Sequence, residues 1–100
     1  MKYPLVSLIV VNYNGKELLR RNLLQLLQTD YPHFEVIVVD NASSNGSVEF
    51  VRANFPSVRI IPLSSNYGYS GGVNVGARYA KGNILGVLNT DVRVKSDWLR

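Results

Sequence analysis

Two aspartates in this sequence stand where a carboxylate could meet a ligand. Asp40 and Asp91 are two of only four aspartates, and each follows a short apolar run, at residues 34–39 and 84–88. A carboxylate in such a place often serves only as a turn or helix-capping residue. It could also do chemistry: Asp40 could accept hydrogen bonds from a ribose or a base, and Asp91 could hold Mg²⁺ or Mn²⁺ against phosphate oxygens. We expect the ligand-binding roles.

Further polar, aromatic and glycine residues extend this pattern. Asn12 and Tyr13 follow the apolar run 5–11, and the Tyr13 ring offers either a face on which a base can stack or a surface that packs on the next helix. Residues 66–76 hold glycines at positions 68, 71, 72 and 76. Glycine lets the backbone approach a phosphate or sugar closely, although small residues also serve helix–sheet packing, which we favour for Gly76.

The spacing of apolar residues predicts the elements that must position these groups. Strands are expected at residues 5–11, 34–39, 58–63 and 84–88, and helices around 18–27, 48–55 and 71–81. Asn14 is the expected N-cap of the first helix, and Gly82 is the expected C-cap of the third. Pro62 fits an edge strand, because proline cannot donate to a sheet ladder.

Strands that alternate with helices in this way indicate an α/β protein. Crossovers of this length join parallel strands, and right-handed connections favour the strand order 3-2-1-4 in a Rossmann-like three-layer sandwich. Ligands bind such sheets outside the carboxyl ends of the strands. All the polar groups described above follow strands, so we expect them to meet at that rim. His33 precedes a strand and is expected on the surface at the opposite end.

Composition narrows the classes of protein that fit. The 100 residues are 46% hydrophobic and contain no cysteine, which excludes disulfide scaffolds, thiol nucleophiles and Cys-based zinc sites. The net charge of +4 attracts anions, but the basic residues are scattered, so we do not expect nucleic acid as a partner. The sequence shows no signal peptide and no long apolar run. We expect a cytoplasmic location, with the full-length protein peripheral at the inner face of the membrane.

Four segments together resemble family 2 of the nucleotide-sugar glycosyltransferases, which have the GT-A fold. They are SLIVVNYN at 7–14, VVDNAS at 38–43, NYGYSGGVNVG at 66–76 and LNTD at 88–91. They occur in the family's order and spacing across essentially the whole chain. The third segment is most similar to the subgroup described as rhamnosyltransferase-like.

The resemblance implies a role for each matching position. Val11, Asn12 and Tyr13 would line the base and ribose pocket, with Tyr13 against a uracil or thymine ring, and Asp40 would accept a hydrogen bond from the base N3–H. The segment 66–74, with Asn66, Gly68 and Asn74, would close over the diphosphate and sugar. Asp91 would contact the divalent metal as the last residue of an Asp-X-Asp motif. Asn89 replaces the first acid of that motif, so it would bind the ribose and weaken metal attraction.

The implied reaction transfers a sugar from a UDP- or dTDP-linked donor to a hydroxyl of a saccharide or lipid-linked acceptor, with inversion at the anomeric carbon. In the family the catalytic base and acceptor site lie downstream of the Asp-X-Asp position. We therefore expect residues 1–100 to be the donor-binding portion of a truncated domain, which binds a donor but does not turn it over.

Two other interpretations remain open on the sequence. The nucleotide-binding half of an oxidoreductase would place an acid near Asp40, but it needs Gly-X-Gly-X-X-Gly directly after the first strand, where only Gly15 occurs. A non-catalytic binding or assembly module would keep the fold without the chemistry. In either case, apolar surface at a cut edge of the sheet would favour dimerisation.

Overall fold

The computed structural model describes residues 3–89. Seven elements alternate along the chain: β1 (Val6–Asn12), α1 (Lys16–Leu26), β2 (Phe34–Asp40), α2 (Ser47–Asn54), β3 (Arg59–Pro62), α3 (Gly68–Tyr79) and β4 (Ile84–Asn89). The strands form a sheet in the order β3-β2-β1-β4, and every neighbouring pair is parallel. The predicted fold class and strand order are confirmed.

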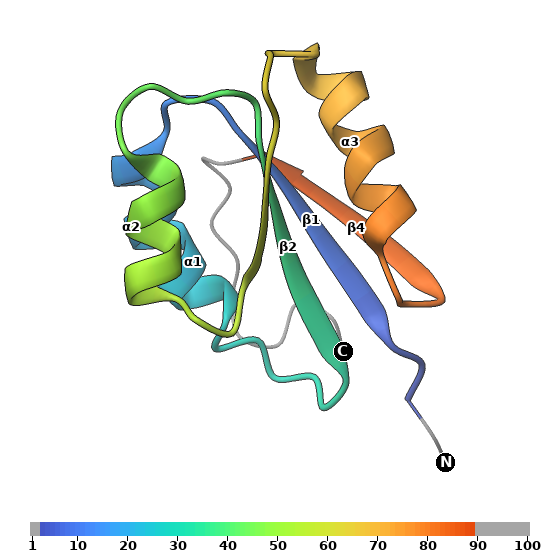
Figure 1. Cartoon of the computed structure of the whole chain (residues 1–100). Coiled ribbons are helices and arrows are strands. Elements are labelled where there is room, and N and C mark those ends of the chain that lie inside the picture. The colour runs from blue at the N-terminus through green and yellow to red at the C-terminus, as the bar shows by residue number, and fades with distance from the viewer. Residues whose placement is uncertain (1–2, 90–100) are drawn as a thin grey trace.

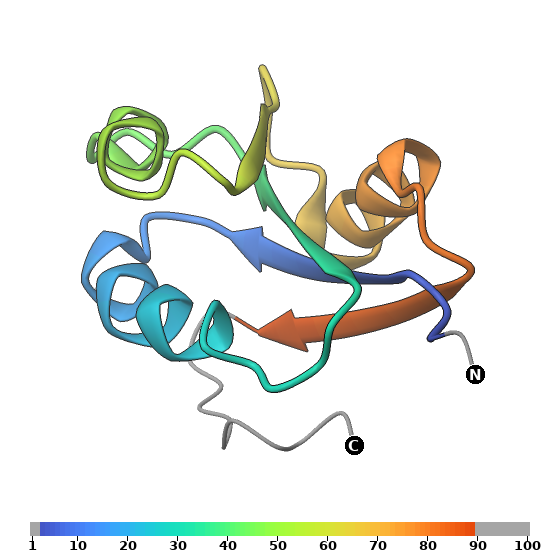
Figure 2. The same ribbon diagram turned by 90° about the horizontal axis from the view of Figure 1, so that it is seen from below.

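The sheet lies between two helical layers, with α1 and α2 on one face and α3 on the other (Figures 1 and 2). Alternate residues of β1 divide between the two faces: Val6, Leu8 and Val10 join the cluster under α1 and α2, while Ile9 joins the cluster under α3. Because helices cover both faces of the central strands, β1 and β2 read as nearly continuous branched-aliphatic runs.

The helix α1 is held by leucines that recur at helical spacing. Leu19, Leu23 and Leu26 are all at most 4% exposed and pack on the sheet, while charged residues occupy the outer side. The edge strand β3 carries Pro62 at its end, as predicted.

Two predicted helix boundaries are wrong. The helix α3 begins at Gly68, three residues before the expected start, and its C-cap is Ala80 rather than Gly82. Gly82 is glycine for a different reason: a Cβ there would lie 2.6 Å from Ser7 Oγ and 2.7 Å from the Leu5 carbonyl oxygen. Close packing against the start of β1 therefore requires it.

Candidate functional site

The carboxyl ends of β1 and β2 bring two of the predicted site residues side by side. Asn12 is the last residue of β1 and Asp40 the last of β2, and the two are register partners. Both are buried, at 0% and 1% exposure. The loops that follow these strands lie at the same end of the sheet, the upper end in Figure 1.

Asp40 is the centre of a hydrogen-bond network at this rim. Its Oδ1 accepts hydrogen bonds from Asn12 Nδ2 at 2.8 Å and from Ser43 Oγ at 2.8 Å, and its Oδ2 accepts one from Ser43 N at 2.9 Å. Each carboxylate oxygen can accept about two hydrogen bonds. Within the described part of the chain, Oδ1 is therefore filled and Oδ2 retains one accepting position.

A second set of contacts locks the β1–α1 loop to the β2–α2 loop. Asn14 N donates to Ser43 Oγ at 2.8 Å, and Ser44 N donates to Asn14 Oδ1 at 2.8 Å. The predicted N-cap role of Asn14 is wrong: Gly15 occupies the N-cap, and no side chain caps α1. Asn14 has a φ of 54° and Ala42 a φ of 63°, a left-handed conformation that costs a non-glycine residue about 1 kcal/mol. Loops that carry such strain are typical of functional sites.

Asn41 ties the third loop to this rim. Its Nδ2 donates to the Gly68 carbonyl oxygen at 3.0 Å, and its Oδ1 accepts from Tyr67 N at 3.1 Å. Asn66 Oδ1 accepts from Gly68 N within that loop, at 2.8 Å. The sequence did not single out Asn41, Ser43 or Asn14 for these roles, although all three lie in segments that carry the resemblance.

The helix α3 sits close to the sheet because glycines face it. A Cβ on Gly72 would lie 2.7 Å from Val11 Cγ1, and one on Gly76 would lie 2.5 Å from Ile9 Cγ2. The packing interpretation of Gly76 is confirmed. Val11, a predicted pocket residue, directs its side chain against Gly72 and therefore toward α3.

Three tyrosines at this end of the molecule are exposed. Tyr13, directly after β1, is 55% exposed, and Tyr67 and Tyr69, at the start of α3, are 59% and 49% exposed. Aromatic rings bury a large area when a flat ligand covers them. The rim thus combines a buried network of polar side chains, centred on Asp40, with exposed tyrosine rings on which a flat ligand could stack.

The remaining predicted site residues lie farther from the Asp40 network or outside the described part of the chain. Asn74 is exposed on α3, two positions from the sheet-facing Gly72 and Gly76, so it lies on the outer side of the helix. Asn89 ends β4 with its backbone opposite Val11. Asp91 lies outside the described residues. Residues 3–89 contain no cluster of three or more His, Cys, Asp or Glu that could hold a metal ion.

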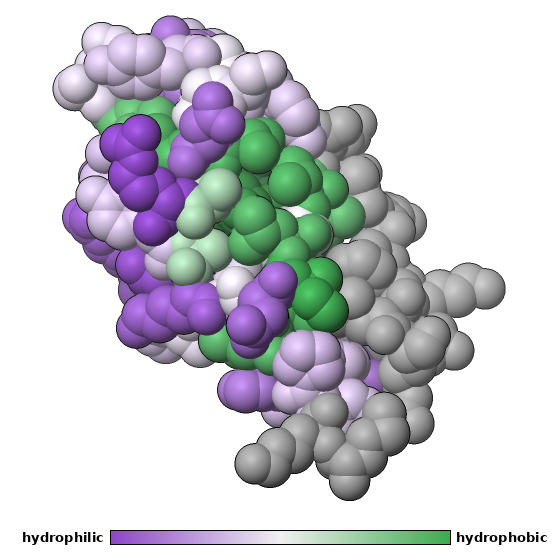
Figure 3. Space-filling view, turned by 90° about the vertical axis from the view of Figure 1, so that its right-hand side faces the viewer, coloured by the Kyte–Doolittle hydropathy of each residue, from purple (hydrophilic) through white to green (hydrophobic). Residues whose placement is uncertain are grey.

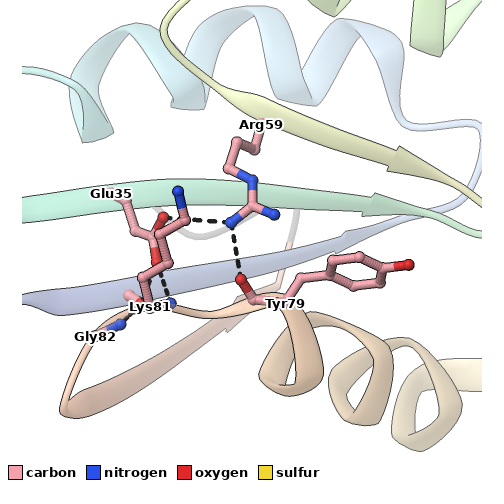
Figure 4. A network of polar contacts seen from close by, with 6 residues as sticks. Glu35, Arg59, Tyr79, Lys81 and Gly82 are labelled. Atoms are coloured by element: carbon pink, nitrogen blue, oxygen red, sulfur yellow. Dashed lines mark hydrogen bonds and ion pairs between the residues drawn. The ribbon is translucent and has the colours of Figure 1, made fainter.

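The opposite end of the sheet is closed by a charged network (Figure 4). Glu35 Oε2 accepts hydrogen bonds from Ser7 Oγ at 2.5 Å and from Lys81 N at 2.7 Å. Arg59 Nη1 lies 3.6 Å from Glu35 Oε1 and donates to the Tyr79 carbonyl oxygen at 2.8 Å. Partial burial by itself raises the pKa of Glu35, but the hydrogen bonds and the nearby cations outweigh it and lower that pKa. His33 is exposed at this end, as expected.

A family model settles the class of protein. The model described as "Glycosyl transferase family 2" matches residues 7–100. The chain belongs to this family. Membership confirms the resemblance read from the four segments and removes the oxidoreductase alternative. None of the helices in the described part of the chain is long and apolar enough to cross a membrane.

Similar curated proteins include one described by succinoglycan biosynthesis and one described as the synthase of a glycolipid. The chain is 35% identical over 100 residues to the succinoglycan biosynthesis protein ExoO of Rhizobium meliloti, covering 99% of this chain and 29% of that protein. It is 31% identical to the glycosyltransferase AglE of Haloferax volcanii, covering 96% and 33%. It is 30% identical to the beta-monoglucosyldiacylglycerol synthase of a Synechocystis species, covering 98% and 22%. The chain therefore spans a third or less of these relatives.

Solved structures agree with the fold. Staphylococcus aureus TarS 1-349 in complex with UDP-GlcNAc superposes with a TM-score of 0.83 at 26% identity, covering 91% of this chain and 28% of that one. The mannosyltransferase PcManGT of Pyrobaculum calidifontis, in complex with GDP-Man and Mn²⁺, superposes with a TM-score of 0.81 at 29% identity, covering 92% and 29%. The rhamnosyltransferase-like subgroup stays a prediction, because no relative named here is described by that activity.

Proposed function

We propose that this chain forms the donor site of a glycosyltransferase that moves a sugar from a nucleotide-diphosphate sugar to an acceptor hydroxyl in polysaccharide or glycolipid synthesis. The observation that carries the proposal is the buried Asn12–Asp40 pair at the carboxyl ends of adjacent parallel strands, ringed by the loops that lead to α1, α2 and α3. Such rims bind ligands in open α/β sheets, and the chain's family transfers glycosyl groups.

The base and ribose would bind beside the ends of β1 and β2. Tyr13 is 55% exposed and can stack on the base, and Asp40 Oδ2 has one position left to accept the base N3–H. Asn12 holds Asp40 in place through its amide. The neighbours bound to UDP-GlcNAc and to GDP-Man support a nucleotide-diphosphate sugar. UDP and dTDP carry the N3–H that Asp40 would accept, whereas the guanine of GDP would have to donate its N1–H instead.

The diphosphate and sugar would bind against residues 66–74. Gly68, with a φ of 76°, turns the chain into α3, whose first backbone N–H groups favour anions. Nothing lies within 4 Å of a Cβ built on Gly68, so the backbone is open to a ligand there. Because Asn74 lies on the outer side of α3, its contact with the donor requires a ligand or chain segment that reaches around the helix.

Asp91 would hold a divalent metal, Mg²⁺ or Mn²⁺, with donor phosphates supplying further oxygens. The Mn²⁺ in the PcManGT complex supports a metal in this family. Asp40 is not proposed for this role, because Asn12 and Ser43 take three of its accepting positions and the base N3–H would take the fourth. Such a metal, when bound, stabilises the charge of the departing nucleotide diphosphate. Asn89 would contribute an amide to the ribose.

The acceptor site and the catalytic base are proposed to lie downstream of Asp91, in keeping with the small share of each relative that this chain covers. The acceptor would be a saccharide or a lipid-linked hydroxyl. A cytoplasmic location at the inner face of the membrane belongs to the same proposal. The isolated chain is expected to bind the donor without transferring sugar.

An amide-detected NMR titration tests the donor site. The folded chain is titrated with UDP, dTDP, GDP and NAD, each with and without Mg²⁺. We expect a nucleoside diphosphate to shift the amides of residues 12–14, 41–44 and 66–72, and Mg²⁺ to strengthen the binding through Asp91. If no nucleotide shifts the amide signals, and a cooperative thermal unfolding transition shows that the chain is folded, the result would instead support a non-catalytic module.

The two edges of the sheet differ, and the difference suggests how the isolated chain associates. β3 has Arg59 and Pro62, which oppose pairing with another strand. β4 has the sequence ILGVLN, with no charge and no proline, and Ile84, Leu85 and Val87 are 38% to 49% exposed. Figure 3 shows apolar side chains gathered on this side of the molecule. We propose a two-fold dimer in which β4 pairs with β4 of a second copy.

Sedimentation velocity over a range of concentrations tests this dimer. Leu85→Lys places a charge on the edge and should shift the chain to the monomer. Leu24→Lys is the matched control, because Leu24 is also an exposed leucine, at 56%, but lies on α1 and not on a strand edge. A wild-type chain that stays monomeric, or a control that dissociates equally, would argue against β4 pairing.

A further inference from the structure

We infer that Asn41 is a positioning residue that holds the phosphate-binding segment in its binding conformation while leaving the base-binding groups unaffected. The inference rests on the proposed donor site and adds to it a residue with no expected ligand contact. Asn41 is buried, and both polar atoms of its side chain are bonded to the backbone of Tyr67 and Gly68, so its effect on a ligand must pass through the groups that it holds.

Asn41 joins two parts of the rim that are distant in sequence. Its backbone N–H donates to the Asn12 carbonyl oxygen at 2.8 Å, which continues the ladder between β1 and β2. Its side chain reaches the backbone of Tyr67 and Gly68, 26 and 27 positions away. The residue therefore sits with its main chain in the sheet and its side chain in the third loop.

The chemistry of this contact requires an amide. The loop presents one donor, Tyr67 N, and one acceptor, the Gly68 carbonyl oxygen, to the same side chain. Only a group with both an N–H and a C=O satisfies the two together. An aspartate of the same shape keeps the acceptor for Tyr67 N but turns a carboxylate oxygen toward the Gly68 carbonyl, where two acceptors repel.

The loop depends on this amide for its shape. In the described part of the chain, the two hydrogen bonds from the Asn41 side chain are the ones that join the backbone of residues 66–68 to the other rim loops. Packing gives little support at Gly68, where a Cβ would meet nothing within 4 Å. One turn further along α3, a Cβ on Gly72 would lie 3.3 Å from Asn41 Nδ2, so the first turn of α3 also rests on this amide.

The base side of the rim is held by other contacts. Asp40 is fixed by Asn12 and Ser43, and the loop that carries Tyr13 is fixed by the exchange between Asn14, Ser43 and Ser44. None of these hydrogen bonds passes through the Asn41 side chain. Loss of the Asn41 amide should therefore weaken contacts to the diphosphate and spare contacts to the base and ribose.

A pair of titrations separates these effects. UDP and uridine are titrated into the wild-type chain, into Asn41→Asp and into Asn54→Asp, with Mg²⁺ present and binding followed by amide shifts. Asn54 is the matched control, because its Nδ2 donates to a backbone oxygen, Phe50 O at 2.9 Å, on an exposed part of α2. We expect Asn41→Asp to weaken UDP binding by about tenfold, because the hydrogen bond to the Gly68 carbonyl oxygen is replaced by repulsion between two acceptors, and to leave uridine binding unchanged. Asn54→Asp should change neither.

Each other outcome is decisive. Equal weakening of UDP and uridine, or weakening of neither, overturns the positioning role of Asn41 and leaves the donor site standing. A wild-type chain that binds neither ligand overturns the donor site itself, and this inference with it. If Asn41→Asp does not fold, Asn41→Ala tests the same contact, because it removes both hydrogen bonds to the backbone of Tyr67 and Gly68 without adding a charge, and the same loss of UDP but not uridine binding is expected.

Discussion

The two ends of the parallel sheet are built from the same strands but in opposite ways. At the amino end, Glu35, Arg59 and the backbone of Lys81 form a charged clamp, and Gly82 packs directly on the start of β1. At the carboxyl end, neutral amides and hydroxyls surround the carboxylate of Asp40, loops adopt left-handed turns, and tyrosines are exposed. The first end holds the layers together, while the second combines strained loops with exposed tyrosines and is the end where we propose that the donor binds. Substitutions should therefore separate stability from binding.

The largest expected effect is on stability at the amino end. Gly82→Ala forces a Cβ to within 2.8 Å of two backbone atoms and Ser7 Oγ, and overpacking of this kind costs about 3 kcal/mol. Chemical denaturation should show the loss, and the fraction that remains folded should bind UDP like the wild-type chain. If Gly82→Ala were as stable as the wild-type chain but bound UDP more weakly, the amino end of the sheet would contribute to binding, and the two ends would not have separate roles.

Asp40→Asn should reduce both properties. The amide cannot accept at both of its positions, so one of the donors from Asn12 or Ser43 loses its partner, at a cost of about 1–2 kcal/mol. Denaturation and UDP titration measure the two effects on one sample. We expect UDP affinity to fall at least tenfold, because the position for the base N3–H is lost. Unchanged affinity would remove Asp40 from the binding site and leave it a structural residue.

Tyr13→Ala should reduce binding alone. The ring is 55% exposed, so stability should change little, while loss of stacking costs about 1–2 kcal/mol of nucleotide affinity. Calorimetric titration with UDP is the measurement. Tyr79→Ala is a useful comparison, since Tyr79 is 49% exposed at the other end of α3 and should leave UDP affinity unchanged.

The smallest effect is the pH dependence carried by Glu35. The pKa of Glu35 is lower in the folded chain than in the unfolded chain, so the unfolded chain takes up a proton first as the pH falls. Its contribution is therefore full above the ordinary carboxyl pKa of about 4.3 and is lost as the pH drops through the lower folded value. Glu35→Gln should flatten the acid side of a plot of melting temperature against pH. A curve of unchanged slope would show that the clamp does not act through the charge of Glu35.

The fold could be predicted because apolar spacing indicates the strands and helices, while crossover length and the right-handed connection rule indicate the strand order. It also placed Asn12 and Asp40 correctly at one rim. It could not find the roles of Asn14 and Asn41, because both depend on contacts between loops that are distant in the chain. The left-handed turn at Ala42 has no local signal, since alanine does not favour that conformation. Gly82 was assigned to a helix end because a glycine near a helix terminus looks the same in sequence whether it turns the chain or makes room for a neighbour.

The order of the strands also bears on how quickly the chain reaches its native state. The central strand β1 gains its first neighbour through contacts such as Asn12 with Asp40, 28 positions apart, but the contact beside its second neighbour, between Ser7 and Gly82, spans 75 positions. Closing the longer loop costs more chain entropy, and topologies rich in such distant pairs fold slowly. During synthesis on a ribosome, one side of β1 therefore stays unpaired until β4 has emerged, and an unpaired strand edge in that interval favours aggregation.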